Sequence, residues 1–146
     1  MNMKFLLVMI TVASLTASLT IAAEIEVNML NKGTKGGMVF EPDLIIAMPS
    51  DTIKFKSVDK GHNAESIKGM LPVGVKPFKS KFSKDFDLVV DKEGLYGIKC
   101  SPHYGLGMVA LVAVGKPVNK DEARSVKHNG KAKTRFADIF TAFDAK

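Results

Sequence analysis

Short stretches in which apolar and polar side chains alternate recur along most of this chain. The alternation has a period of two, as in Ile53-Lys-Phe-Lys-Ser57, which is typical of a strand with one buried face. Glycine, proline and aspartate mark the turns between these stretches. Many short strands separated by turns favour an all-β sandwich. We predict strands over residues 24–30, 38–48, 51–57, 85–91, 94–100 and 107–115, with residues 62–84 as a long, mostly irregular connection between sheets.

After Pro117 the pattern changes to that of a helix. Asn119 is a plausible N-cap before Lys-Asp-Glu-Ala. Four apolar side chains then recur at the i, i+3, i+4 and i+7 positions, which predicts one buried helical face: Phe136, Ile139, Phe140 and Phe143. We expect this helix to cover the sandwich rather than to bind a partner. The prediction is one domain, with a sandwich over about 23–116 and a helical tail over about 117–146.

The first residues have the pattern of a secretory signal peptide. Lys4 precedes the apolar run Phe5-Leu-Leu-Val-Met-Ile, and small residues follow up to Ala22 and Ala23. A membrane anchor fits less well, because spanning a bilayer takes about 20 predominantly apolar residues and Ser and Thr interrupt this run from Thr11 onward. We expect cleavage after Ala22 or Ala23. Residues 1–22 are then the signal peptide, and residues 23–146 are a soluble domain outside the cytoplasm that does not bind the membrane.

The net charge of +6 comes almost entirely from lysine, since only Arg124 and Arg135 among 21 basic residues are arginines. A basic chain of 146 residues raises the possibility of nucleic-acid binding. Groove recognition relies on bidentate arginine, however, and no strip of basic and aromatic residues is present. We therefore expect no nucleic-acid partner. Hydrated lysine charges suit loose docking better than rigid recognition.

Cys100 is the sole cysteine, so no internal disulfide is possible. It could be an inert thiol, a nucleophile or a metal ligand. A nucleophile needs a base and an orienting group, for which a domain of this size leaves little room. If Cys100 were an inert thiol, the nearby His103 and Met108 would have no explanation. Cys100, His103 and Met108 lie in Cys-x2-His-x4-Met spacing on one loop between two predicted strands.

Thiolate, imidazole and thioether are the soft donors that select copper, whereas zinc rarely takes a thioether. A second imidazole is needed to complete the set. His62 leaves the strand 51–57 at a glycine turn, where the end of a sandwich presents ligands. His128 lies in a lysine-rich stretch that reads as a helix end, and we expect it to be an ordinary surface histidine.

Five blocks of the sequence, taken in order, resemble the bacterial periplasmic blue-copper proteins of the cupredoxin family. They are Ile25-Glu-Val-Asn-Met-Leu-Asn-Lys-Gly33, Met38-Val-Phe-Glu-Pro42, Val58-Asp-Lys-Gly-His-Asn63, Phe78-Lys-Ser-Lys81 and Lys99-Cys-Ser-Pro-His-Tyr-Gly105. The resemblance implies a cupredoxin-like Greek-key β-sandwich with a C-terminal helical extension.

The same resemblance implies one type 1 copper per chain, held by His62, Cys100, His103 and Met108. It further implies that Asn63 hydrogen-bonds across the site beside the sulfur and that Met38 packs near an exposed His103 ring. Ser101 and Leu106 depart from the family pattern, where threonine and methionine are usual. Neither is a ligand.

Four protein donors leave no open position for a substrate, which argues against an enzyme. The expected function is that of a monomeric, periplasmic one-electron carrier. The alternative is a copper-binding or delivery protein, which needs labile and exposed ligands. The resemblance implies donation to denitrification enzymes such as nitrite reductase, with a c-type cytochrome as another redox partner.

The docking surface should be apolar around His103, with lysines around it that steer an acidic partner. We expect the apolar part to come from Met38, Pro102, Leu106 and Met70. Lys60 and Lys99 lie next to ligands in the sequence, and the resemblance adds Lys32 and Lys79 to the ring.

Overall fold

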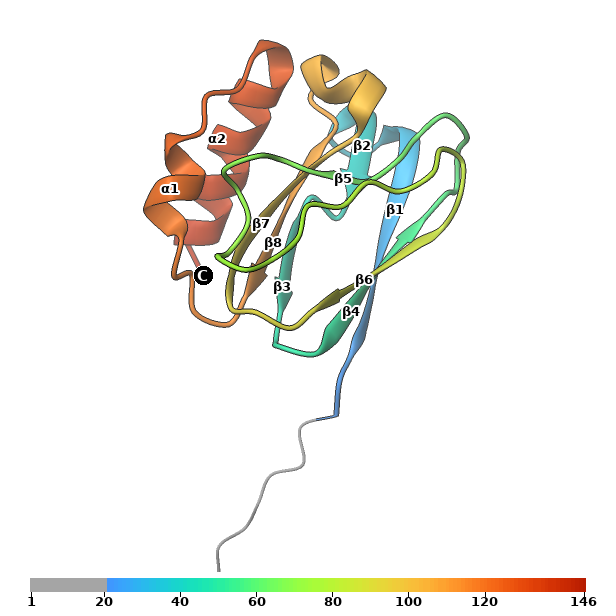
Figure 1. Cartoon of the computed structure of the whole chain (residues 1–146). Helices are drawn as coiled ribbons and strands as arrows, with labels where there is room; N and C mark the ends of the chain where they lie inside the picture. The colour runs from blue at the N-terminus through green and yellow to red at the C-terminus, as the bar shows by residue number, and fades with distance from the viewer. Residues whose placement is uncertain (1–20) are drawn as a thin grey trace, which may run out of the picture.

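Two four-stranded sheets form the body of the protein in a computed structural model that describes residues 21–146 (Figure 1). Sheet A has the order β2 (Gly36–Glu41), β1 (Glu24–Gly33), β4 (Asp51–Lys56) and β6 (Phe86–Val90). Sheet B has the order β3 (Leu44–Ala47), β8 (Val109–Val114), β7 (Gly94–Lys99) and β5 (Glu65–Ser66). The pairs β1–β4 and β3–β8 are parallel, and the other pairs are antiparallel. The predicted β-sandwich is thus confirmed.

The expected signal peptide, residues 1–22, lies almost wholly outside the described residues and remains a prediction. Among residues 21–146, no helix is both long enough and apolar enough to cross a membrane.

The predicted strand over 38–48 is wrong, because the chain changes sheets in its middle. β2 pairs with β1 in sheet A, and β3 pairs with β8 in sheet B. Pro42 lies between them, where its missing N–H prevents the ladder from continuing. The segment 62–84 is mostly irregular as expected, but it contributes the two-residue strand β5.

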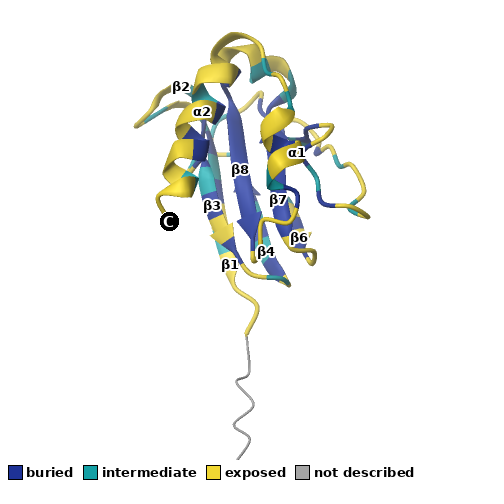
Figure 2. Cartoon of the chain, turned by 90° about the vertical axis from the view of Figure 1, so that its left-hand side faces the viewer, coloured by how far each residue is buried: buried dark blue, intermediate teal, exposed yellow. Residues whose placement is uncertain are grey.

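Strands β7 and β8 are buried on both faces. Tyr96, Ile98 and Cys100 face the core between the two sheets, while Leu95 faces a second core. β8 alternates in the same way, so that Met108 belongs to the inter-sheet core and Val109 to the second core. This two-sided burial (Figure 2) fixes the ends of both strands. Cys100 directly follows β7 and Met108 directly precedes β8.

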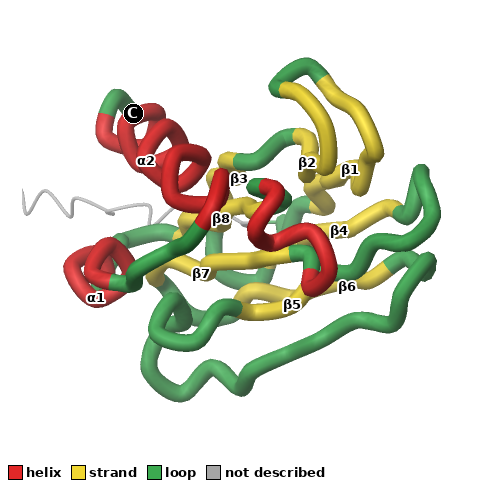
Figure 3. Tube along the Cα trace, turned by 90° about the horizontal axis from the view of Figure 1, so that it is seen from above, coloured by secondary structure: helices red, strands yellow, loops and turns green. Residues whose placement is uncertain are grey.

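The second core lies between sheet B and two C-terminal helices, α1 (Lys120–Ser125) and α2 (Gly130–Asp144), as Figures 2 and 3 show. The predicted stripe is confirmed, with Phe136, Ile139 and Phe140 buried and Phe143 packed against the same cluster. The tail is therefore two helices that cover the sandwich.

Asn119 occupies the N-cap position of α1 but makes no side-chain capping bond. Its side chain instead accepts a hydrogen bond from the Leu95 amide at 2.7 Å and donates one to the Leu95 carbonyl at 3.0 Å. The predicted capping role is thus replaced by a bond that ties the tail to β7.

Candidate metal centre

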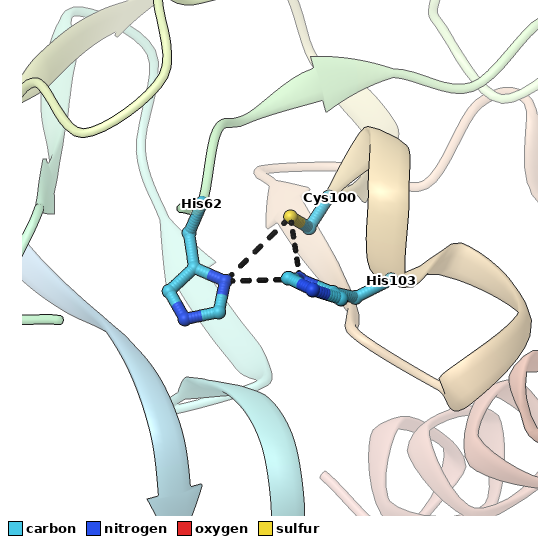
Figure 4. A group of neighbouring side chains, drawn as sticks. All are labelled: His62, Cys100 and His103. Carbon is cyan, nitrogen blue, oxygen red and sulfur yellow. Dashed lines mark hydrogen bonds between the residues drawn. The ribbon is translucent and has the colours of Figure 1, made fainter. Parts of the chain in front are cut away.

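Three side chains from two distant parts of the sequence direct their donor atoms toward one point between the sheets (Figure 4). The Sγ of Cys100 lies 3.8 Å from Nδ1 of His62 and 3.5 Å from Nδ1 of His103. The two Nδ1 atoms are 3.1 Å apart. The imidazole rings meet edge to face, at an interplanar angle of 63°.

The β7–β8 hairpin supplies most of the site. Cys100 directly follows β7, His103 lies in the 3-10 helix η1 (Ser101–Leu106), and Met108 directly precedes β8. The amide of Cys100 donates to the Met108 carbonyl at 2.9 Å, and the amide of Met108 donates to the His103 carbonyl at 3.1 Å. Gly107 makes the turn possible, because its φ of 89° is a conformation that other residues rarely adopt.

His62 enters from the other side, on the loop between β4 and β5. Its Nε2 lies 2.8 Å from Oδ1 of Asn31, a residue of β1 that the sequence did not single out. Because this amide oxygen can only accept, Nε2 of His62 carries the proton and donates it. Nδ1 is then a free lone pair directed toward Cys100 and His103. Asn31 thus sets the tautomer that a metal ligand needs.

Burial distinguishes the donors. His62, Cys100 and Met108 are fully buried, whereas His103 is half-buried and lies between the exposed Pro102 and Leu106. Burial lowers the pKa of His62, and the neighbouring His103 lowers it further. Burial raises the pKa of the Cys100 thiol, which hydrogen bonds from the backbone of Asn63 and His103 partly oppose. The ring nearest the solvent is His103.

Asn63 is fully buried and forms two hydrogen bonds to Ser101, the residue after Cys100. Its Oδ1 accepts a hydrogen bond from the Ser101 amide at 2.8 Å, and its Nδ2 donates to the Ser101 hydroxyl at 2.9 Å. That hydroxyl in turn donates to Glu65. Burial alone would raise the pKa of Glu65, but the bond from Ser101 and the charges of Lys99 and Lys79 outweigh it and lower that pKa.

The expected docking residues occupy different settings. Lys79 and Lys99 lie 3.4 and 4.0 Å from the carboxylate oxygens of Glu65, while Lys32 and Lys60 are exposed. Met38, in β2, is half-buried against the inter-sheet core, and β2 contacts η1.

Two expectations are wrong. Met70 is fully buried under Gly97 and forms no part of the surface. His128 is not an ordinary surface histidine, because its ring stacks on Phe136 at 4.2 Å and its Nδ1 lies 2.6 Å from the Tyr104 hydroxyl.

The donor set fits copper. Donors about 2.0–2.3 Å from one ion stand roughly 3.3–3.8 Å from each other, close to the separations between Cys100, His62 and His103. One thiolate, two imidazoles and a nearby thioether make the set typical of a blue-copper site. The three residues form a candidate type 1 copper site, with Met108 nearby.

Comparisons with known proteins agree with this chemistry. Residues 27–115 match the family described as copper binding proteins, plastocyanin/azurin family. Pseudoazurin of Paracoccus pantotrophus is 53% identical over 115 residues, which cover 78% of this chain and 79% of that protein. Pseudoazurin of Methylorubrum extorquens is 49% identical over 120 residues, 82% of this chain and 81% of that protein.

Solved structures give the same result for the fold. The crystal structure of pseudoazurin from Methylobacterium extorquens AM1 superposes with a TM-score of 0.80 at 48% identity, covering 82% of this chain and 98% of that one. The structure of native pseudoazurin from Hyphomicrobium denitrificans superposes with a TM-score of 0.78, also at 48% identity, over 82% of this chain and 97% of that one. The chain therefore belongs to the plastocyanin/azurin family of copper-binding proteins, and it shares the cupredoxin fold of the pseudoazurins.

Proposed function

We propose that this protein is a periplasmic one-electron carrier whose type 1 copper is held by His62, Cys100, His103 and Met108. The observation that carries this proposal is the convergence of Nδ1 of His62, Sγ of Cys100 and Nδ1 of His103 within 4.8 Å of one another. When bound, copper supplies a redox couple that accepts and releases one electron. The signal-peptide pattern of residues 1–22 supports export to the periplasm.

Burial favours a carrier over the alternative, a copper-delivery protein. Delivery needs ligands that a receiving protein can reach and replace, whereas His62, Cys100 and Met108 are fully buried. The hydrogen bond from His62 to Asn31 and those within the hairpin hold the donors in place, so they need to move little when the charge of the site changes. The same closed ligand set supports electron transfer rather than an enzymatic reaction.

His103 is the proposed point of electron exit and entry, because its ring is the least buried of the four ligands. Exposed Pro102 and Leu106 flank it and offer a small apolar contact. The lysines expected around this face, Lys32, Lys60, Lys79 and Lys99, support an acidic redox protein as partner, with nitrite reductase or a c-type cytochrome as candidates. Redox encounters of this kind bury little area and dissociate fast.

An absorption spectrum of the copper-loaded protein tests the proposal. We expect an intense visible thiolate-to-copper band that disappears on one-electron reduction and returns on oxidation. The Cys100→Ser variant should fold but lose the band, since the thiolate produces it. Met108→Gln is the matched variant, and it should keep the band while the reduction potential shifts. A wild-type protein with no visible band, which instead passes Cu(I) readily to a chelator, would support delivery and overturn the carrier proposal.

A further inference from the structure

His128 is attached to the loop that carries His103, although it lies in the tail between α1 and α2. Its ring stacks on buried Phe136 with a centroid distance of 4.2 Å and an interplanar angle of 24°. Its Nδ1 lies 2.6 Å from the Tyr104 hydroxyl, and the two rings are nearly perpendicular at 86°. Its Nε2 is buried and has no hydrogen-bond partner among residues 21–146. The single hydrogen bond of this ring therefore goes to Tyr104.

Tyr104 follows His103 directly and is held from several sides. The ammonium group of Lys99 lies 5.1 Å from the centre of the tyrosine ring, on its face. The Tyr104 carbonyl accepts a hydrogen bond from the Gly107 amide at 3.0 Å, in the turn that leads to Met108. Fixing the Tyr104 side chain therefore restrains the backbone on both sides of it, toward His103 and toward Met108.

The first turn of α2 packs against the same loop. A Cβ atom on Gly130 would lie only 2.4 Å from the carbonyl oxygen of Gly105, so the two backbones are in direct contact. A Cβ atom on Gly107 would approach Lys131 to 3.1 Å. The tail thus meets η1 through backbone packing and, at His128, through one directed hydrogen bond.

We propose that His128 is a positioning residue for the metal centre, which acts through the Tyr104 hydroxyl to hold η1 and so fixes the His103 ring against Cys100. This role rests on the proposed function of the site. Phe136 fixes the plane of the His128 ring, Nδ1 of His128 fixes the hydroxyl, and the tyrosine side chain restrains the backbone next to the ligand. The tail then does more than cover a sheet, because it determines how rigidly one ligand is held.

Two matched variants test the role. His128→Phe keeps an aromatic ring that can stack on Phe136 but lacks Nδ1, and Tyr104→Phe removes only the hydroxyl from the other partner. Because each breaks the same hydrogen bond, amide exchange within 103–108 should quicken about three- to ten-fold in either variant of the purified protein. The double variant should show no further increase, as expected for a directly coupled pair. In the copper-loaded protein, both single variants should shift the reduction potential in the same direction.

Ile139→Val is the control for general loss of stability, because Ile139 is buried in α2 nine residues after Gly130, where that helix contacts the backbone of Gly105. It should lower the melting temperature while leaving the potential and the exchange within 103–108 unchanged. Unchanged exchange and potential in both His128→Phe and Tyr104→Phe would overturn the proposal, as would additive effects in the double variant. Amide exchange can be measured whether or not the protein shows a visible copper band. A missing band would therefore count against the proposed function, and unchanged exchange would count against the role of His128.

Discussion

Asn31 shows how one polar side chain determines the chemistry of a buried ligand. Its amide oxygen accepts a hydrogen bond from the protonated Nε2 and so leaves the lone pair on Nδ1 of His62 free. No sequence pattern singles out this residue, because an asparagine directly after the predicted strand 24–30 fits an ordinary turn. Its role depends on how β1 and the loop after β4 meet in space, at a separation of 31 residues.

Asn31→Ala should weaken copper binding by about 10- to 100-fold, since partners that orient a ligating histidine typically contribute that much. Competition with a copper chelator measures the change. Lys32→Ala is the matched control, because it removes the neighbouring exposed side chain and leaves the bond to His62 in place. Equal affinities in the wild type and Asn31→Ala would contradict the assigned role.

Gly97 illustrates a constraint of packing at a single position. A Cβ atom there would lie 2.5 Å from Sδ and 2.6 Å from Cβ of Met70, so β7 and the buried methionine touch without space for a methyl group.

Gly97→Ala should therefore lower the free energy of unfolding by about 1–3 kcal/mol, the usual cost of overpacking. Urea denaturation of the two proteins measures it. Gly37→Ala provides the comparison, because a Cβ atom at Gly37 would make only an ordinary contact of 3.6 Å with the Asn31 carbonyl. A Gly97→Ala protein as stable as Gly37→Ala would show that Met70 moves aside at little cost.

At the scale of elements, alternation identified most strands, and the i, i+3, i+4, i+7 pattern identified the buried face of α2. The hydrophobic pattern could not reveal that 38–48 changes sheets, since both halves are mostly apolar and only tertiary pairing separates them. β5 was missed because two residues carry no period. His128 was misjudged because its lysine-rich neighbours are exposed, whereas its own ring contacts Phe136, eight residues onward in α2.

The attachment of the tail should depend on pH through His128. Burial lowers the pKa of this imidazole from the ordinary histidine value of about 6.5. The unfolded chain then binds a proton more readily than the folded chain, so stability is full above about pH 6.5 and falls as the pH drops below it.

Unfolding of the metal-free protein between pH 8 and 5 measures this effect. The pKa of His62 is also lowered, so the wild type should show the contributions of both histidines. His128→Phe should make the pH dependence shallower and leave the part due to His62. If the stability of His128→Phe depended on pH as that of the wild type does, His128 would not contribute to the pH dependence of stability.

At the scale of the whole molecule, the charge distribution governs encounters with partners. Glu65 partly neutralises Lys79 and Lys99, to which it lies within 3.4 and 4.0 Å. Within the described residues, no ion pair involves Lys32 or Lys60. Sequence proximity alone could not distinguish these two classes of lysine.

Lys60→Glu should therefore lower the bimolecular rate of electron transfer to an acidic redox protein several-fold without changing the visible band. The rate should also fall steeply with added salt, because exposed charges are screened over roughly 8 Å at 0.15 M. Stopped-flow kinetics at several ionic strengths measures both effects. Lys146→Glu, at the chain end, is the control and should leave the rate unchanged. Equal responses of the two variants would show that the lysines only provide solubility.

The division of the ligands between two parts of the chain also orders the assembly of the site during folding. Cys100, His103 and Met108 belong to one hairpin, whose ends meet by closing a short loop, and short loops close early. His62 lies 38 residues before Cys100 and is oriented by β1 of the opposite sheet. Its imidazole reaches the cysteine only when the two sheets dock. The metal pocket thus joins two halves of the molecule, and it is complete only when both sheets are in place.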